Sequence, residues 1–210
     1  MKRLTDEISE QIDQETRLLA AIAYGEASIA DDIDEISGIA HAVANRSSAW
    51  GKRVSEVIKA DPGYTYAADG SNERFNLLMS SPISSINKNR GMKIAVNTAK
   101  EALAGEGFDP SNGAYWWDGP DLKLERAQNS RIKLGFKYGN PSHNIYGMNE
   151  ILKPVVKYWQ IRNKKTGELV NSTVRGRFDS GYVSTAAHGK TIFWKYNPDY
   201  VTATGCKAYR

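Results

Sequence analysis

The sequence predicts an α+β protein, with helices in the first half of the chain and strands in the second. Apolar residues recur at helical spacing within residues 15–104, whereas aromatic and β-branched residues form short runs after residue 114. With 210 residues, of which 40% are hydrophobic and 25% charged, the chain can bury one core but is short for two full domains. We expect a polar lead-in at 1–15 and a single domain at 16–210.

The first expected helix covers residues 15–28 and places a carboxyl group on an apolar face. Leu18, Ile22 and Glu26 stand four residues apart, so they share one side of the helix and Glu26 ends the apolar stripe. Burial among apolar neighbours favours the neutral form of a carboxyl group. A neutral carboxylic acid is the reagent that protonates a glycosidic oxygen. The alternative is a structural glutamate, either in solvent or paired with Arg46.

Three more helices and several strands complete the expected domain. The further helices are expected at 36–47, 54–60 and 92–104. Strands are expected at 115–117, 158–162, 168–170 and 189–196. The acidic run 31–35 suits the first turn of the second helix, where negative charge meets the positive end of the helix dipole. Residues 64–70 are interpreted as a strand or a loop with a turn, and Lys164–Gly167 as a hairpin turn.

Several common kinds of active site are absent from the sequence. His41, His143 and His188 lie far apart and have no zinc-ligand spacing. Cys206 lies near the last residue, with no helix after it to activate the thiol. Neither the Gly-x-Ser-x-Gly elbow of serine hydrolases nor a phosphate-binding Gly-x-x-x-x-Gly-Lys motif occurs. We therefore expect no metal and no cofactor.

The chain also shows no feature of Sec-type export or membrane spanning. Its longest strongly apolar run, residues 18–24, is far shorter than the about 20 residues that a spanning helix needs. The first eight residues include acidic ones where a signal peptide carries its apolar stretch. A single cysteine forms no internal disulfide. We expect synthesis in the cytoplasm without a Sec signal.

Charge is distributed unevenly between the two halves. Residues 1–110 contain 12 Lys and Arg against 17 Asp and Glu, whereas residues 111–210 contain 16 against 7. The second half is therefore the part that would meet an anionic partner such as nucleic acid, phospholipid or an acidic wall polymer.

Several short segments resemble one known family. They are Tyr24-Gly25-Glu26-Ala27, Ala42–Arg46, Tyr64–Gly70, Ala99–Gly105 with Asp109–Trp116, and Gly189–Trp194. In this order they resemble the spore-cortex-lytic type of bacterial cell wall hydrolase. The chain departs from that pattern at Thr191, where the family usually has histidine, and in its long segment 118–187, which has no counterpart.

The resemblance implies a lysozyme-like α+β fold: a mainly helical core, a small β-sheet and an inserted segment at about 118–187. It implies cleavage of the β-1,4 bond between N-acetylmuramic acid and N-acetylglucosamine, by a muramidase or a lytic transglycosylase. Glu26 would protonate the leaving oxygen and then deprotonate either water or the muramoyl 6-hydroxyl. Asp69 is a second catalytic candidate, although Asp-Gly is also an ordinary turn dipeptide.

The expected substrate-binding residues are mostly aromatic side chains with flat faces for sugar stacking. They are Tyr24, Tyr64, Tyr115, Trp116, Trp117 and, as a brace near the site, Asn45. Strand residues alternate sides, so at least one of the three consecutive aromatics is expected in the core.

Two other functions remain open at this point: a peptidoglycan amidase, and a non-catalytic basic wall-binding module. The expected partner is the peptidoglycan glycan strand rather than nucleic acid, and a cognate immunity or inhibitor protein is a further candidate. We expect a monomer that reaches the wall or periplasm by non-Sec export or lysis, as a secreted antibacterial effector or a phage lysin.

Overall fold

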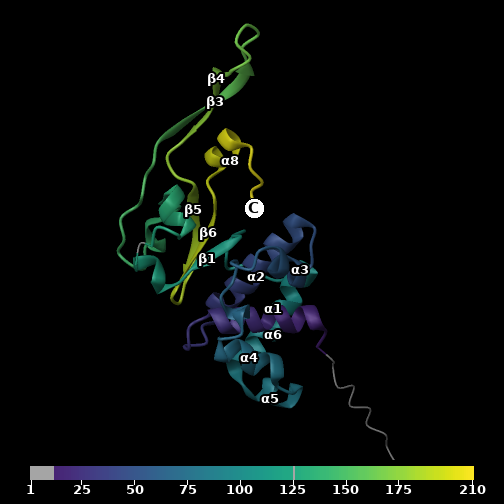
Figure 1. Ribbon diagram of the computed structural model, residues 1–210. Coiled ribbons are helices and arrows are strands. Elements are labelled where there is room, and N and C mark those ends of the chain that lie inside the picture. The colour runs from purple at the N-terminus through teal and green to yellow at the C-terminus, as the bar shows by residue number, and fades with distance from the viewer. Residues whose placement is uncertain (1–11, 125) are drawn as a thin grey trace, which may run out of the picture.

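The computed structural model describes residues 12–124 and 126–210, and the fold is α+β, as predicted (Figure 1). The helices are α1 (Gln14–Glu26), α2 (Ile33–Trp50), α3 (Val54–Ala60), α4 (Glu73–Ser80), α5 (Ile83–Lys88), α6 (Arg90–Ala104), α7 (Ser130–Leu134) and α8 (Pro198–Thr204). The strands are β1 (Trp116–Asp118), β2 (Phe136–Lys137), β3 (Val155–Arg162), β4 (Leu169–Phe178), β5 (Tyr182–His188) and β6 (Thr191–Tyr196). Short 3-10 helices are η1 (Ala67–Asp69), η2 (Pro120–Leu124) and η3 (Pro141–His143).

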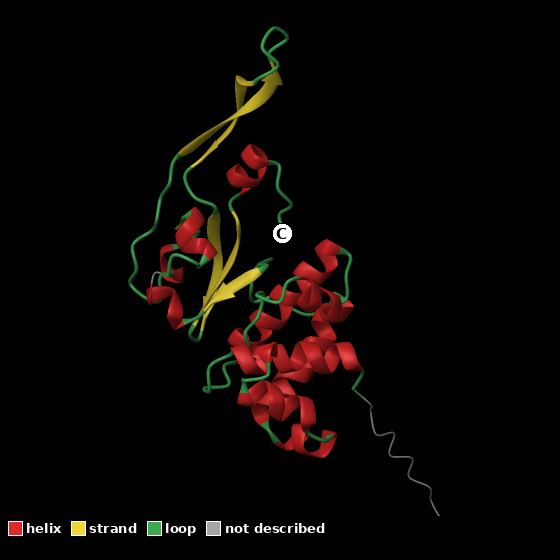
Figure 2. Ribbon diagram, in the orientation of Figure 1, coloured by secondary structure: helices red, strands yellow, loops and turns green. Residues whose placement is uncertain are grey.

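Helix α1 is the centre of the helical part, and α2, α4 and α6 pack around it (Figure 2). Its middle section, Leu19–Ala23, is completely buried, which is typical of a helix that is apolar on all sides. The helix begins where the Asp13 carboxylate accepts a hydrogen bond of 3.0 Å from the Thr16 N–H, as an N-cap residue does. The alanines of α1 allow three neighbouring helices to approach closely.

The strands form a four-stranded sheet of order β1-β6-β5-β2 and a separate hairpin, β3-β4. Strand β2 pairs in parallel with β5, and the other pairs are antiparallel. Strand β6 joins the two cores of the protein because its side chains point alternately to the two faces of the sheet. Phe193 belongs to the helical core, whereas Ile192 and Trp194 belong to a second core that covers the other face of the sheet. A Cβ atom at Gly38 of α2 would lie 2.5 Å from the Phe193 ring, so glycine permits this contact.

A buried carboxylate, Glu35, ties the helical part to the sheet. One of its oxygens accepts hydrogen bonds from the Ser28 N–H at 3.1 Å and the Ser28 hydroxyl at 2.5 Å. The other accepts from the Lys190 N–H at 3.0 Å and the Thr191 hydroxyl at 2.9 Å. Gly189, with φ of +56°, turns the chain so closely over this carboxylate that a Cβ would lie 2.6 Å from it. The α1–α2 loop and the β5–β6 turn are thereby joined.

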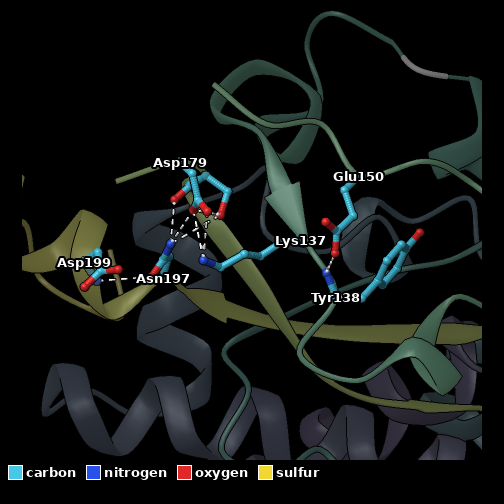
Figure 3. A network of polar contacts seen from close by, with 7 residues as sticks. Lys137, Tyr138, Glu150, Asp179, Asn197 and Asp199 are labelled. Carbon is cyan, nitrogen blue, oxygen red and sulfur yellow. Dashed lines mark hydrogen bonds and ion pairs between the residues drawn. The ribbon is translucent and has the colours of Figure 1, made fainter. Parts of the chain in front are cut away.

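A second polar network anchors the base of the β3-β4 hairpin. In Figure 3, Lys137 and Asn197 both point toward Asp179, which follows β4. The Lys137 ammonium lies 2.9 Å from the Asp179 carboxylate, and the Asn197 amide donates to it at 3.3 Å. The hydrogen bond from Lys137 is the main reason why the pKa of Asp179 lies below its ordinary value. The base of the hairpin is therefore fixed to β2 and to the start of α8.

The expected helices at 15–28, 36–47, 54–60 and 92–104 are confirmed as α1, α2, α3 and α6, with shifted ends. The segment 64–70 contains η1 rather than a strand, because the Tyr66 carbonyl accepts from the Asp69 N–H in a tight turn. Residues 118–187 are not separate from the sheet, since they supply β2 and β5. Of the expected lead-in, residues 1–11 lie outside the described chain. Within the described ranges, no helix is long and apolar enough to cross a membrane.

Glu35→Ala is expected to lower the free energy of unfolding by about 3 kcal/mol or more, because buried N–H and hydroxyl donors lose their acceptor. Asp34→Ala, in the same turn but exposed, is the control and should cost less than about 1 kcal/mol. Urea unfolding followed by circular dichroism measures both. Equal stability of the two variants would contradict the role given to Glu35.

Candidate active site

A cleft of about 680 Å³ lies where the end of α1 meets β1. Glu26, the last residue of α1, lies in it together with residues 63–66 and the indole rings of Trp116 and Trp117. Eight residues that follow β1 or end it line the cleft as well, and they are Asp118, Gly119, Asp121, Arg126, Gln128, Asn129, Ser130 and Arg131. The cleft thus combines a carboxyl group, aromatic faces and many polar side chains, a combination that suits an extended polar ligand such as a carbohydrate.

Three hydrogen-bond donors hold the Glu26 carboxylate. The Thr65 hydroxyl donates to Oε1 at 2.5 Å, and the Ala67 N–H donates to the same oxygen at 2.7 Å. The indole N–H of Trp117 donates to Oε2 at 3.3 Å. The donors come from two segments far from α1 in the sequence, residues 65–67 and β1, so the tertiary fold fixes the orientation of this side chain.

The residue before Glu26 explains how these donors reach it. A Cβ atom at Gly25 would lie 3.0 Å from the side chains of Asn72 and Phe75 and 3.1 Å from Ala67. The Asn72 amide also donates to the Gly25 carbonyl at 2.9 Å. Glycine therefore lets η1 and the start of α4 close over the end of α1, which brings the Ala67 N–H to the carboxylate.

Arg46 supports the aromatic floor of the cleft and is not the partner of Glu26. Its guanidinium forms an ion pair of 2.8 Å with Asp61 and donates at 2.8 Å to the Tyr209 carbonyl. It also lies 4.1 Å above the centre of the Tyr64 ring, a cation–π contact. Tyr64 in turn meets the ring of Trp117 edge-on, with centroids 5.2 Å apart. Burial raises the pKa of Tyr64, so its hydroxyl stays a donor.

A buried ion pair stabilises the opposite wall. Arg131 of α7 lies 2.7 Å from the Asp118 carboxylate, and Asn129 donates to that carboxylate at 3.0 Å. Arg131 also donates to the Trp117 carbonyl at 3.2 Å. Burial raises the pKa of Asp118, and the positive charge of Arg131 opposes this effect. This wall belongs to the segment 118–187 that has no counterpart in the resembled family.

The structure brings four of the expected site residues together at the cleft: Glu26, Tyr64, Trp116 and Trp117. As expected for a strand, one of the three consecutive aromatics is a core residue, and this is Trp116, which is 9% exposed. Thr65 was not among the expected site residues, although it lies in the segment 64–70 that resembles the cell wall hydrolases. Arg131 was also missed, and no sequence pattern marks it.

The other four expected site residues lie outside the cleft lining. Tyr24 is buried beneath the guanidinium of Arg74, 3.8 Å from its ring centre. Tyr115 packs edge-on against Trp116, with centroids 5.8 Å apart. Asp69 is exposed and accepts hydrogen bonds from the hydroxyl and N–H of Ser71, which lower its pKa. Asp69 thus closes a turn beside the site.

The fourth, Asn45, braces the loop that leads into β1. Its side-chain amide donates to Asp109 at 2.9 Å and to the Ala114 carbonyl at 3.3 Å. Burial by itself raises the pKa of Asp109, but hydrogen bonds from Ser111, Asn45 and Gly113 outweigh it and hold the pKa below its ordinary value. Asn45 therefore acts on the site indirectly, by positioning the strand that carries Trp117.

Comparison with known proteins identifies no similar protein. No protein-family model, curated protein or solved structure matches this chain. Among the described residues, no three His, Cys, Asp or Glu side chains gather in a way that would hold a metal ion. The function must therefore be inferred from the cleft itself.

Asp109→Asn is expected to destabilise the protein most at neutral pH. Because folding lowers the pKa of Asp109, the carboxylate contributes stability above its unfolded pKa of about 3.9, and this contribution is lost as pH falls through the lower folded pKa. The difference in unfolding free energy between wild type and variant should therefore shrink as the pH falls below about 5. Urea unfolding at several pH values measures this difference. A difference that is independent of pH would contradict the stabilising role of the Asp109 carboxylate.

Proposed function

We propose that this protein is a peptidoglycan hydrolase of lysozyme-like fold, which cleaves the β-1,4 bond between N-acetylmuramic acid and N-acetylglucosamine with Glu26 as its catalytic acid. The observation that carries the proposal is the half-buried Glu26 carboxyl group, held by three donors from two distant segments at the side of an aromatic cleft. The resemblance of the Tyr24–Ala27 segment to cell wall hydrolases supports the same choice of residue.

The two oxygens of Glu26 differ in a way that favours one of them for proton transfer. Oε1 accepts two short hydrogen bonds and is fully engaged. Oε2 accepts the longer contact of 3.3 Å from Trp117. A proton on Oε2 would pass to the glycosidic oxygen as the bond breaks, and the resulting carboxylate would then take a proton from the attacking hydroxyl.

The remaining carboxylates of the cleft favour a mechanism in which one carboxyl group does both tasks. In the described part of the chain, Asp61 and Asp118 line the cleft but are held in ion pairs with Arg46 and Arg131. Asp121 is exposed on η2. Glu26 would therefore act first as acid and then as base, with either water or the muramoyl 6-hydroxyl as nucleophile. Mass spectrometry of the products distinguishes these, because the 1,6-anhydro product is lighter by one water.

Glu26→Gln is expected to lower the rate of peptidoglycan cleavage by about 100-fold or more, because an amide of the same shape donates no proton to the leaving oxygen. Turbidity loss of purified cell walls and release of new reducing or anhydro ends measure the rate. Thermal unfolding checks that the variant is folded.

Asp69→Asn is the matched control, because it removes a neighbouring carboxylate that lies outside the cleft. It should leave the rate of cleavage close to that of the wild type. If Asp69→Asn is the more damaging change, the catalytic role belongs to Asp69. Release of free amino groups by the wild type, without new sugar ends, would identify an amidase instead, and binding without any cleavage would identify a wall-binding module.

A further inference from the structure

The β3-β4 hairpin carries apolar side chains that the rest of the protein does not cover. Figures 1 and 2 show its outer half extending away from the N-terminal helices and from the main sheet, beyond α8. The exposed fractions are 53% for Trp159, 52% for Ile161, 61% for Leu169 and 45% for Val174. A two-stranded hairpin alone is only marginally stable in water. Large apolar side chains gathered on such an element indicate a surface that is covered by a partner.

The hairpin is also strongly cationic. Residues 155–178 contain six Lys and Arg but one acidic residue, Glu168. Two of the lysines, Lys164 and Lys165, stand at the exposed tip, and Arg175 lies 4.5 Å above the ring of Trp159. The partner surface is therefore expected to be anionic.

The base of the hairpin is firmly held, so its outer half is presented at a fixed place. Gly176 lies against α8, where a Cβ would come within 2.8 Å of Ala203. Phe178 meets the ring of Tyr200 edge-on, with centroids 5.0 Å apart. Beyond this base, Gln160 bonds to Asn171 across the strands, and Arg162 donates to the Gly167 carbonyl at 2.5 Å.

We propose that the outer half of this hairpin docks on an anionic phospholipid bilayer. Groups of four to eight Lys and Arg bind anionic lipid headgroups, and Trp and Tyr favour the boundary between headgroups and acyl chains. A soluble polyanion such as nucleic acid would match the charge but would leave Ile161, Leu169 and Val174 in water. A bilayer interface satisfies both the charge and the apolar area.

The strand register places both kinds of side chain where a bilayer can reach them. Tyr158 stands opposite Val174, and Arg162 stands opposite Leu169, on one face of the hairpin. Ile161 stands opposite Val170 and so lies on the other face, and Trp159 stands at an irregularity of the register between Tyr158 and Gln160. The lysines of the tip would contact lipid phosphates while the apolar side chains of the two strands enter the interface.

The proposal is tested by co-sedimentation of the full chain with vesicles of phosphatidylglycerol and phosphatidylethanolamine, and with phosphatidylcholine vesicles for comparison. We expect binding to the anionic vesicles that weakens as salt rises. Each basic residue near an anionic bilayer raises partitioning by roughly fivefold, so Lys164→Gln/Lys165→Gln should lower it by about 25-fold. Trp159→Ser/Ile161→Ser should lower it by about tenfold or more.

Lys88→Gln/Lys93→Gln is the matched control, since it removes the same charge from exposed positions on α5 and α6, far from the hairpin (Figure 1). It should bind vesicles nearly as wild type does. Thermal unfolding checks each variant. The proposal is overturned if anionic vesicles bind no more protein than phosphatidylcholine, or if the serine variant binds as wild type does. It is also overturned if a duplex DNA oligonucleotide binds more tightly than the anionic vesicles, which would assign the surface to a soluble polyanion.

Discussion

The hydrogen bonds of the buried Glu35 carboxylate determine how the two parts of this protein sit against each other. Its acceptor oxygens take donors from the loop after α1 and from the turn before β6, which lie far apart in the sequence. Strand β1 pairs with β6, so the position of β6 also fixes that of Trp117. The junction at Glu35, together with the packing of Phe193 in the helical core, holds the sheet where Trp117 reaches Glu26, and the cleft lies between these two parts.

The floor of the cleft depends on a second set of contacts, which centre on Arg46. Arg46 is almost fully buried, and it binds Asp61, the Tyr64 ring and the carbonyl of Tyr209 near the end of the chain. The planar guanidinium group can do all of this at once, because its edges donate hydrogen bonds while its face stacks on an aromatic ring. An ammonium group would not reproduce this geometry. The floor of the cleft therefore depends on an arginine that has no part in the proposed chemistry.

The sequence predicted α1, α2 and α6, which have long apolar periodicity, and also the short α3, but it missed α4 and α5. Helices α4 and α5 are short, and tertiary contacts rather than a repeated apolar pattern stabilise them. Glu26 was found because its place on an apolar helix face can be read locally. The role of Glu35 was missed. Its acidic neighbours indicate the start of a helix, which is correct, but two of its hydrogen-bond partners, Lys190 and Thr191, stand more than 150 residues away. Thr65 and Arg131 were not predicted as site residues for the same reason, because only the tertiary structure brings them to the cleft.

The four residues Tyr24–Ala27 are consecutive, but they have different environments. Tyr24 is buried under the guanidinium of Arg74, and Ala27 is buried where α1 ends. Gly25 is required because its neighbours leave no room for a Cβ. Packing thus accounts for three of these residues. Glu26 differs from them because it is half-buried at the cleft, where its Oε1 accepts hydrogen bonds from the buried Thr65 hydroxyl and the Ala67 N–H. One oxygen of Glu26 thus serves the structure, while Oε2, with its single contact of 3.3 Å, is the atom that the proposed proton transfer would use.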